Sequence, residues 1–208
     1  MIDPMTFAQA AEQLASWGRW LYERGWSPAT SSNYSMRLDA ESCAITTSGR
    51  DKGLLTPGQI MAVDLDGRPI GNGKPSAETL LHTRLYRRFP EVGAVLHTHS
   101  IGSTVLSRAV GPGQPLVLTG YELAKAFPGI TDHETPLVVP VIANSQDMTV
   151  LAAAADAAIS AAPGIRAYLI CGHGVYTWGP DLDTTRRQVE ALEFLFACEF
   201  SFGKFLVI

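Results

Sequence analysis

One stretch of the sequence reads Val92-Gly93-Ala94-Val95-Leu96-His97-Thr98-His99-Ser100, a short apolar run closed by two histidines one residue apart. The apolar run predicts a β-strand, and residues i and i+2 of a strand project from the same face. The imidazoles of His97 and His99 can therefore point to one place and supply half of a tetrahedral zinc site. The alternative is that they are two ordinary polar residues at a strand end, and the pair alone does not separate the two interpretations.

A third histidine closes a second apolar run, which reads Ala167-Tyr168-Leu169-Ile170-Cys171-Gly172-His173-Gly174. The glycines beside His173 allow the backbone to turn sharply and to approach another element closely. Three histidines that leave a fourth position open are the catalytic form of zinc coordination, and open sheets usually place their sites where strands end. We therefore predict that His97, His99 and His173 hold a catalytic metal ion. Cys171 could be a further ligand, but its apolar neighbours favour a small buried thiol.

Composition limits what the protein can be. The 208 residues are 46% hydrophobic and 17% charged, which predicts one folded domain over residues 1–208. The net charge of −4 argues against nucleic acid or an anionic membrane as partner. Neither a signal peptide nor a membrane span is expected. The cysteines are odd in number and widely spaced, which indicates reduced thiols in a cytoplasm: Cys43, Cys171 and Cys198.

The order of the expected elements predicts an α/β fold. A capping box at Thr6-Phe7-Ala8-Gln9 opens the first helix. The expected strands are 35–38, 43–47, 60–64, 68–70, the run before His97, 115–118, 137–142, the run before His173, and 175–178. The further helices are 76–89, 100–109, 144–162 and a last one from about 181, apolar on more than one face. This order predicts a central mixed, mainly antiparallel sheet flanked by helices.

Three polar segments are candidates for binding an anion. Residues 28–35 are rich in hydroxyl side chains, and they are either a polar connection or an anion cradle. The turn Ser48-Gly49-Arg50-Asp51-Lys52-Gly53 carries two cations, and alone it reads as a surface loop. Ser76 is a natural N-cap for the helix over 76–89, and a helix N-terminus is itself an anion site. If the three segments meet, they could form a phosphate site.

Two glutamates lie close to these features in the sequence. Glu78 falls in the first turn of the helix that Ser76 opens, where favourable interaction with the helix dipole is the usual role. Glu122 follows the strand over 115–118, which places its carboxylate just beyond an apolar run. His82 lies four residues after Glu78 on the same helix face, and we interpret it as a packed or exposed histidine.

The histidine motifs, His97-Thr98-His99-Ser100 and Gly172-His173-Gly174, resemble those of the class II aldolase/adducin-type family. The similarity runs from the first helix to the last. Within the family, the chain length and two further motifs are most similar to the dehydratase branch: Lys74-Pro75-Ser76-Ala77-Glu78-Thr79 and Leu118-Thr119-Gly120-Tyr121-Glu122. Aldolases or epimerases acting on another sugar phosphate are the first alternative, and a metal-free adducin-type interaction module is the second.

The resemblance implies a cytoplasmic, zinc-dependent lyase that dehydrates a ketose phosphate. It implies a homotetramer with active sites near subunit boundaries, a small sugar phosphate as substrate, and no nucleic acid or membrane partner. One zinc ion per subunit would be held by His97, His99 and His173. The substrate phosphate would lie among three pairs of residues: Ser32 and Asn33, Ser48 and Gly49, Ser76 and Ala77.

The resemblance divides the acid/base role between the two glutamates. Aldolases of the family use the glutamate that matches Glu78, and its dehydratases use one that matches Glu122. This chain has both residues. We expect Glu122 to transfer protons and Glu78 to be a second catalytic residue of the same site.

Overall fold

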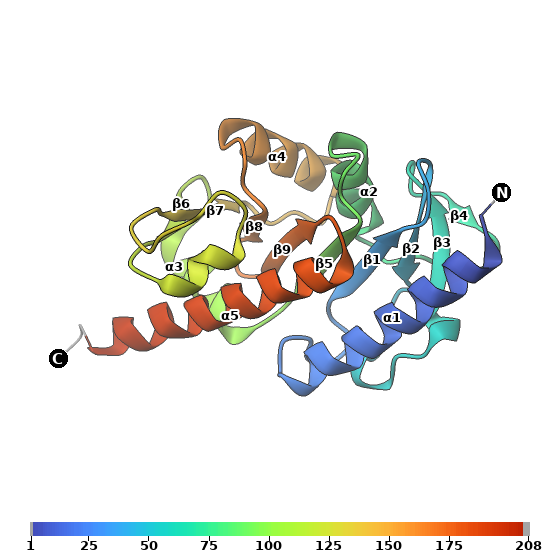
Figure 1. Cartoon of the computed structure of the whole chain (residues 1–208), viewed down its shortest axis with the longest axis horizontal. Helices are drawn as coiled ribbons and strands as arrows, with labels where there is room; N and C mark the ends of the chain where they lie inside the picture. The colour runs from blue at the N-terminus through green and yellow to red at the C-terminus, as the bar shows by residue number, and fades with distance from the viewer. Residues whose placement is uncertain (1, 206–208) are drawn as a thin grey trace.

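The computed structural model describes residues 2–205, in which five α-helices surround a nine-stranded sheet (Figure 1). Met1 and residues 206–208, the ends of the predicted domain, lie outside the described residues. The helices are α1 (Pro4–Glu23), α2 (Thr79–Arg88), α3 (Ile101–Val110), α4 (Met148–Ala161) and α5 (Leu182–Phe205). Three short 3₁₀ helices accompany them: η1 (Lys52–Leu54), η2 (Pro57–Gln59) and η3 (Glu122–Ala126).

The sheet is mixed and mainly antiparallel, as the sequence predicts. Its strands are β1 (Asn33–Arg37), β2 (Ser42–Thr46), β3 (Ile60–Asp64), β4 (Pro69–Ile70), β5 (Ala94–Thr98), β6 (Pro115–Leu118), β7 (Leu137–Ile142), β8 (Ala167–Ile170) and β9 (Gly174–Gly179). The spatial order is β4-β3-β2-β1-β5-β9-β8-β7-β6. Among these pairs, only β7 and β8 run parallel. The strand β5, which carries His97 and ends just before His99, is fifth in this order and lies at the centre of the sheet.

Helices cover both faces of the sheet, α2 and α4 on one face and α1, α3 and α5 on the other (Figure 1). The alternation of side chains along β5 distributes its residues between the two layers. Val95 packs in the cluster beneath α2 and α4, whereas Ala94 and Leu96 pack in the cluster beneath α1. His97 follows on the face of Val95, so its imidazole lies on the side of α2.

The first helix begins earlier than the sequence pattern predicts. The Asp3 side chain accepts hydrogen bonds from the backbone amides of Met5 at 3.3 Å and Thr6 at 3.1 Å, and Pro4 occupies the first helical turn. Aspartate followed by proline satisfies the free amides of a helix start before the chain reaches Thr6. The capping box predicted at residues 6–9 is therefore wrong.

The start of α2 also differs from the prediction, and this difference shapes the site. The Ser76 amide donates to the Thr46 carbonyl at 3.2 Å, and Pro75 pairs with Thr47 beyond the end of β2. This pairing holds residues 74–76 in an extended conformation, so Ser76 is not the N-cap. Glu78 takes that position without making a side-chain capping bond, which leaves its carboxylate available.

The last helix is apolar on more than one face, as the sequence predicts. Leu192, Leu195 and Phe196 are buried against the sheet, whereas Phe194 and Phe202 are 55% and 58% exposed. Within residues 2–205, no helix has the length and hydropathy needed to cross a membrane.

Candidate metal centre

The structure brings His97, His99 and His173 together. One possible ligand atom from each ring lies within 4.8 Å of the corresponding atoms of the other two. The rings of His97 and His173 have centroids 5.0 Å apart, and both lie 4.5 Å from that of His99. The antiparallel pairing of β5 with β9 produces this cluster, because it places the start of β9 beside the end of β5.

Two glycines allow the turn that carries His173. Gly172 has a φ of +65°, a left-handed conformation that glycine adopts without steric cost. A Cβ atom at Gly174 would lie 2.1 Å from the Thr98 carbonyl oxygen and 3.0 Å from Cε1 of His97. The absence of a side chain at Gly174 is therefore what lets the two strands meet at the histidines, in agreement with the close approach predicted from the sequence.

The tautomer of His97 suits a metal ligand. Its Nδ1 lies 3.0 Å from the carbonyl oxygen of Val175, and because a carbonyl can only accept, Nδ1 carries the proton. The lone pair is then on Nε2, which is buried and has no hydrogen-bond partner. Burial, reinforced by His173, holds the pKa of His97 well below its usual value. Burial also lowers the pKa of His99 to about 2, so both rings are neutral.

Glu78 faces this cluster from the start of α2. Its Oε2 lies 3.3 Å from Nε2 of His97, and its Oε1 lies 3.2 Å from Nε2 of His173. Three imidazoles and a carboxylate thus converge on one place, and such a donor set fits a divalent cation such as zinc.

A buried hydrogen-bond network fixes the orientation of Glu78. The Asn33 amide donates to Oε2 at 2.8 Å, and the Tyr176 hydroxyl donates to the same oxygen at 2.7 Å. Nε2 of His82 lies 2.5 Å from the Asn33 amide oxygen, and its Nδ1 lies 2.7 Å from the Ser35 hydroxyl. Because the amide oxygen can only accept, His82 donates to it and turns the Asn33 amino group toward Glu78. Burial lowers the pKa of His82 to about 3, which keeps the ring neutral.

Two residues of this network were not predicted to belong to the site. His82 is a packed histidine, which is one of the two interpretations that the sequence left open. Its spacing from Glu78 indicated that the two residues share a helix face. The spacing could not indicate that His82 hydrogen-bonds Asn33 on another element. Tyr176 carries no sequence signal, because an aromatic residue in an apolar strand is typical of a core.

A small polar cavity of about 200 Å³ adjoins the histidines. It is lined by His99, His173, Glu78 and members of all three predicted anion-binding segments, among them Ser32, Asn33, Ser48, Gly49, Ser76 and Ala77. The structure thus brings the three segments together. The side-chain amide of Asn33 donates to Glu78 and accepts from His82, so both of its ends are engaged within the network.

A second cavity, of about 580 Å³, shares only His99 and His173 with the first. Its walls include the apolar side chains of Pro28, Ile101 and Val105, together with Thr104, Asn144 and Gln146. The two histidines therefore stand between a polar cavity and a more apolar one. A ligand bound at the histidines could extend into both cavities.

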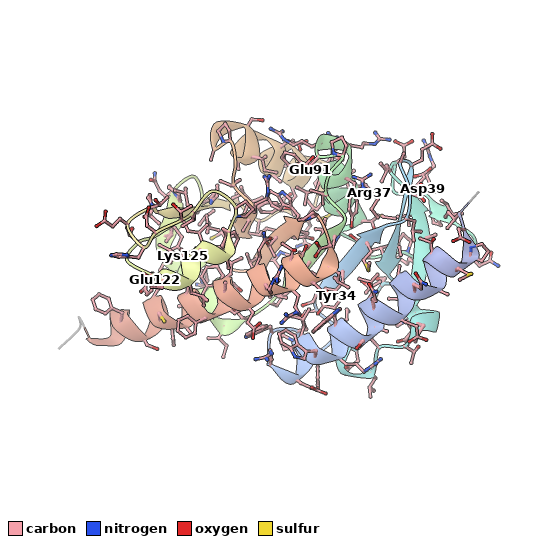
Figure 2. The ribbon with its side chains drawn as sticks, in the orientation of Figure 1. Tyr34, Arg37, Asp39, Glu91, Glu122 and Lys125 are labelled. Atoms are coloured by element: carbon pink, nitrogen blue, oxygen red, sulfur yellow. The ribbon has the colours of Figure 1, made fainter. Side chains whose placement is uncertain are left out.

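Glu122 lies elsewhere in the described chain. It begins η3, which packs on α5, and its side chain is 70% exposed beside Lys125 (Figure 2). Its Oε1 lies 3.5 Å from Nδ1 of His133. The hydrogen bond from Lys125 lowers the pKa of Glu122. Glu122 lines neither cavity at the histidines. Cys171 packs against an apolar cluster beneath α3 and α5 and is not part of the histidine group.

A family model described as Class II Aldolase and Adducin N-terminal domain matches residues 12–200. The chain belongs to this family. The resemblance seen in the histidine motifs is therefore confirmed.

Relatives and solved structures agree with this membership. The chain is 54% identical to methylthioribulose-1-phosphate dehydratase of Marinobacter nauticus, over 96% of each protein. It is 52% identical to the protein of that name from Pseudomonas syringae pv. tomato, over 94% of this chain and 96% of the relative. The crystal structure of L-fuculose-1-phosphate aldolase from Thermus thermophilus aligns over 97% of each chain with a TM-score of 0.74 and 26% identity. YgbL from Klebsiella pneumoniae aligns over 95% of this chain and 91% of its own with a TM-score of 0.80, also at 26% identity.

Proposed function

We propose that this protein is a metal-dependent lyase that removes water from 5-methylthioribulose 1-phosphate. The product is 2,3-diketo-5-methylthiopentyl 1-phosphate, and the setting is methionine salvage. The proposal rests on the three-histidine cluster, of which His99 and His173 line both cavities, in a chain whose relatives at 52–54% identity are named methylthioribulose-1-phosphate dehydratase. The sugar-phosphate aldolases share the fold at lower identity, so an aldolase or epimerase activity is not favoured.

The proposed cofactor is one zinc ion per subunit, held by His97, His99 and His173. Bound zinc would supply Lewis acidity at the ketone end of the substrate and stabilise negative charge that develops there. The free lone pair of His97 and the neutral state of His99 support this assignment.

The two cavities suggest how the substrate lies. We assign the phosphate to the polar cavity, where Ser32, Ser48, Gly49, Ser76 and Ala77 offer hydroxyl and amide donors, with Asn33 at its edge. The methylthio end then extends past the histidines into the cavity lined by Pro28, Ile101 and Val105. Because both ends of the substrate are held, its reacting carbons are kept in one position beside the histidines.

Dehydration moves two protons, and two glutamates are available for them. One proton leaves the carbon between the ketone and the hydroxyl to be lost, and that hydroxyl departs with another proton as water. The enol left behind tautomerises to the diketone. We propose that Glu78, which faces His97 and His173, accepts the carbon proton. Glu122 keeps its proposed proton-transfer role at the departing hydroxyl, which requires that burial against a neighbouring subunit offset the effect of Lys125 and let the carboxyl hold a proton.

Because Glu122 is exposed and lines neither cavity of its own subunit, we propose that it acts in a neighbouring subunit of a homotetramer. The exposed phenylalanines of α5, next to η3, support an assembly that covers this region. The cysteines are unpaired, which supports the proposed cytoplasmic location.

The activity test is incubation of zinc-loaded protein with 5-methylthioribulose 1-phosphate, followed by mass spectrometry. Loss of one water with formation of the diketone is the expected result. Two smaller fragments would indicate retro-aldol cleavage and contradict the proposal. Metal-free protein that stays inactive after zinc addition would instead favour a non-catalytic module.

The subunit arrangement has its own test. Glu78→Gln and Glu122→Gln tetramers should each lose most turnover while they keep their metal. Dissociating and remixing the two variants should restore activity at roughly a quarter of the sites, those that combine Glu78 of one subunit with Glu122 of its neighbour. If remixing restores nothing although mixed tetramers form, Glu122 does not act across the boundary.

A further inference from the structure

The turn over residues 48–53 carries two cations, and the structure separates them sharply. Lys52, the first residue of η1, is 1% exposed and lines the polar cavity. Arg50 is exposed and does not line that cavity, and its Nε lies 3.3 Å from the Thr47 hydroxyl. Of the two cations, only Lys52 is placed to meet a ligand in the cavity.

The ammonium group of Lys52 is buried without a direct ion-pair partner among the described carboxylates. Its Nζ donates to the carbonyl oxygens of Arg50 at 2.7 Å and Thr30 at 3.5 Å, and it forms no ion pair with any described carboxylate. The neighbouring Asp51 instead accepts a hydrogen bond from the Gly53 amide. Carbonyl dipoles compensate only part of the cost of burying a charge.

The pKa of Lys52 agrees with this description. Burial lowers it to about 8, and the nearby charge of Asp51 only partly opposes the effect. An anion in the cavity would favour the ammonium form and supply the charge that is missing. Apart from Glu78, His99 and His173 of the candidate metal centre, the other residues that line the cavity offer hydroxyls, amides and backbone groups, which can position an anion but cannot balance its charge.

We infer that Lys52 is the cation that binds the substrate phosphate and makes the enzyme select a phosphorylated ketose over the unphosphorylated sugar. This inference rests on the proposed function, because it identifies the charge within the proposed phosphate site. The hydroxyl and amide donors of the three segments then set the position of the phosphate, and Lys52 supplies most of the electrostatic attraction.

A purely structural role for Lys52 is the competing explanation. Through its two carbonyl partners, Lys52 ties the segment around Thr30 to the turn around Arg50. That segment contains two non-glycine residues in the left-handed region, Ala29 with φ of 55° and Ser32 with φ of 70°. A structural tie would lower thermal stability when it is removed, but it would not by itself change the affinity for a small anion in a folded variant.

The test compares Lys52→Met with Arg50→Met, which removes the other cation of the same turn. Calorimetric titration of the zinc-loaded enzymes with inorganic phosphate should give the wild type and Arg50→Met the same affinity. Lys52→Met should bind phosphate roughly 10- to 100-fold more weakly, the range expected for loss of a charge-assisted hydrogen bond. With the phosphorylated substrate, KM should rise by a similar factor while kcat changes little.

Equal phosphate affinity in Lys52→Met and wild type would overturn the inference, and so would a wild type that binds no phosphate. If Lys52→Met does not fold, Lys52→Gln replaces it, and the wild-type Nζ resonance of Lys52 offers a further readout that needs no variant. That resonance should shift on phosphate addition, and an unchanged resonance would count against the inference. Phosphate binding is measured without the ketose, so a failure of the proposed dehydration would be recognised separately.

Discussion

Tyr176 donates its hydroxyl proton to Oε2 of Glu78 across 2.7 Å, from a strand position directly opposite His97. The Asn33 amide donates to the same oxygen, so Oε2 has two fixed donors. The other oxygen, Oε1, faces His173 and is the one left to accept a proton. The ring of Tyr176 also stacks on His97, with centroids 4.1 Å apart, so one residue orients both a proposed ligand and the proposed base.

Replacing Tyr176 by phenylalanine should lower kcat roughly 10- to 100-fold, because a hydrogen bond to a charged group contributes about 1.5–3 kcal/mol. Zinc content should stay at the wild-type level, since the ring remains stacked on His97. Steady-state kinetics and metal analysis measure the two effects. Tyr168→Phe is the matched control, because Tyr168 is equally buried and its hydroxyl has no partner. Equal kcat values for the two variants would refute the role given to Tyr176.

Gly174→Ala should weaken the proposed metal site. The new Cβ would overlap the Thr98 carbonyl oxygen, so β5 and β9 must separate near His97. Overpacking of this kind typically costs about 1–3 kcal/mol, and we expect it to appear both in the free energy of unfolding and in a lower zinc affinity. Competition with a zinc-binding dye measures the affinity. Gly58→Ala, whose nearest contact would be 4.0 Å away, should leave both quantities unchanged.

Removal of the His97 imidazole should abolish metal binding. His97 is fully buried, and no other described side chain is placed to replace its Nε2. Elemental analysis of His97→Ala should find almost no zinc, compared with about one ion per subunit in the wild type. His133→Ala should retain zinc, because His133 lies beside Glu122 and outside the cluster. Full zinc occupancy in His97→Ala would contradict the proposed ligand set.

Val105→Asp should impair recognition of the methylthio end. Val105 is 39% exposed and lines the larger cavity at the histidines. A charge there would need to be desolvated against an apolar group, and we expect KM for the methylthio substrate to rise roughly tenfold. The 5-hydroxy analogue should be affected less. Val150→Asp, on the exposed side of α4, serves as control and should show wild-type kinetics for both substrates.

Glu193 makes stability depend on pH. Burial raises its pKa to about 7, although hydrogen bonds from Ser100 and Thr98 oppose the shift. The folded state therefore holds this proton more tightly than the unfolded chain does. Its contribution to stability is present below the ordinary glutamate pKa of 4.5 and is lost as the pH rises through 7.

Glu193→Gln should remove this dependence. At about pH 8 the variant should be more stable than the wild type by up to about 3 kcal/mol, and the difference should vanish near about pH 4. Urea unfolding across this range gives the free energies. Glu12→Gln, an exposed carboxylate on α1, should follow the wild type at every pH. A constant offset between Glu193→Gln and the wild type would mean that Glu193 does not titrate as described.

Local patterns predicted the elements well where tertiary contacts agree with them. The apolar runs before His97 and before His173 indicate strands that the structure contains as β5 and β8. The helix predicted over 100–109 is α3, and Ser100 caps it with its hydroxyl 2.9 Å from the Ser103 amide. The prediction that Ser76 caps α2 was wrong because residues 74–76 pair with the chain at the end of β2. This contact involves a segment far away in the sequence, which a local pattern cannot indicate.

The histidines of the site were predictable because their positions follow from local strand patterns. Spacing of i and i+2 puts His97 and His99 together, and a second strand end of the same kind supplies His173. The positions of the Glu78 and Glu122 carboxylates could not be predicted from such local patterns. Periodicity gives the helix face of Glu78 but not the residues across from it, and the location of Glu122 depends on how η3 packs against α5.

The pairing of His97 with Tyr176 has a consequence for how the gene can vary. Inserting or deleting a single codon within β5 would shift the pairing by one and turn the imidazole to the layer beneath α1, away from Glu78. A scan of one-codon deletions should therefore find no active clones between residues 94 and 98.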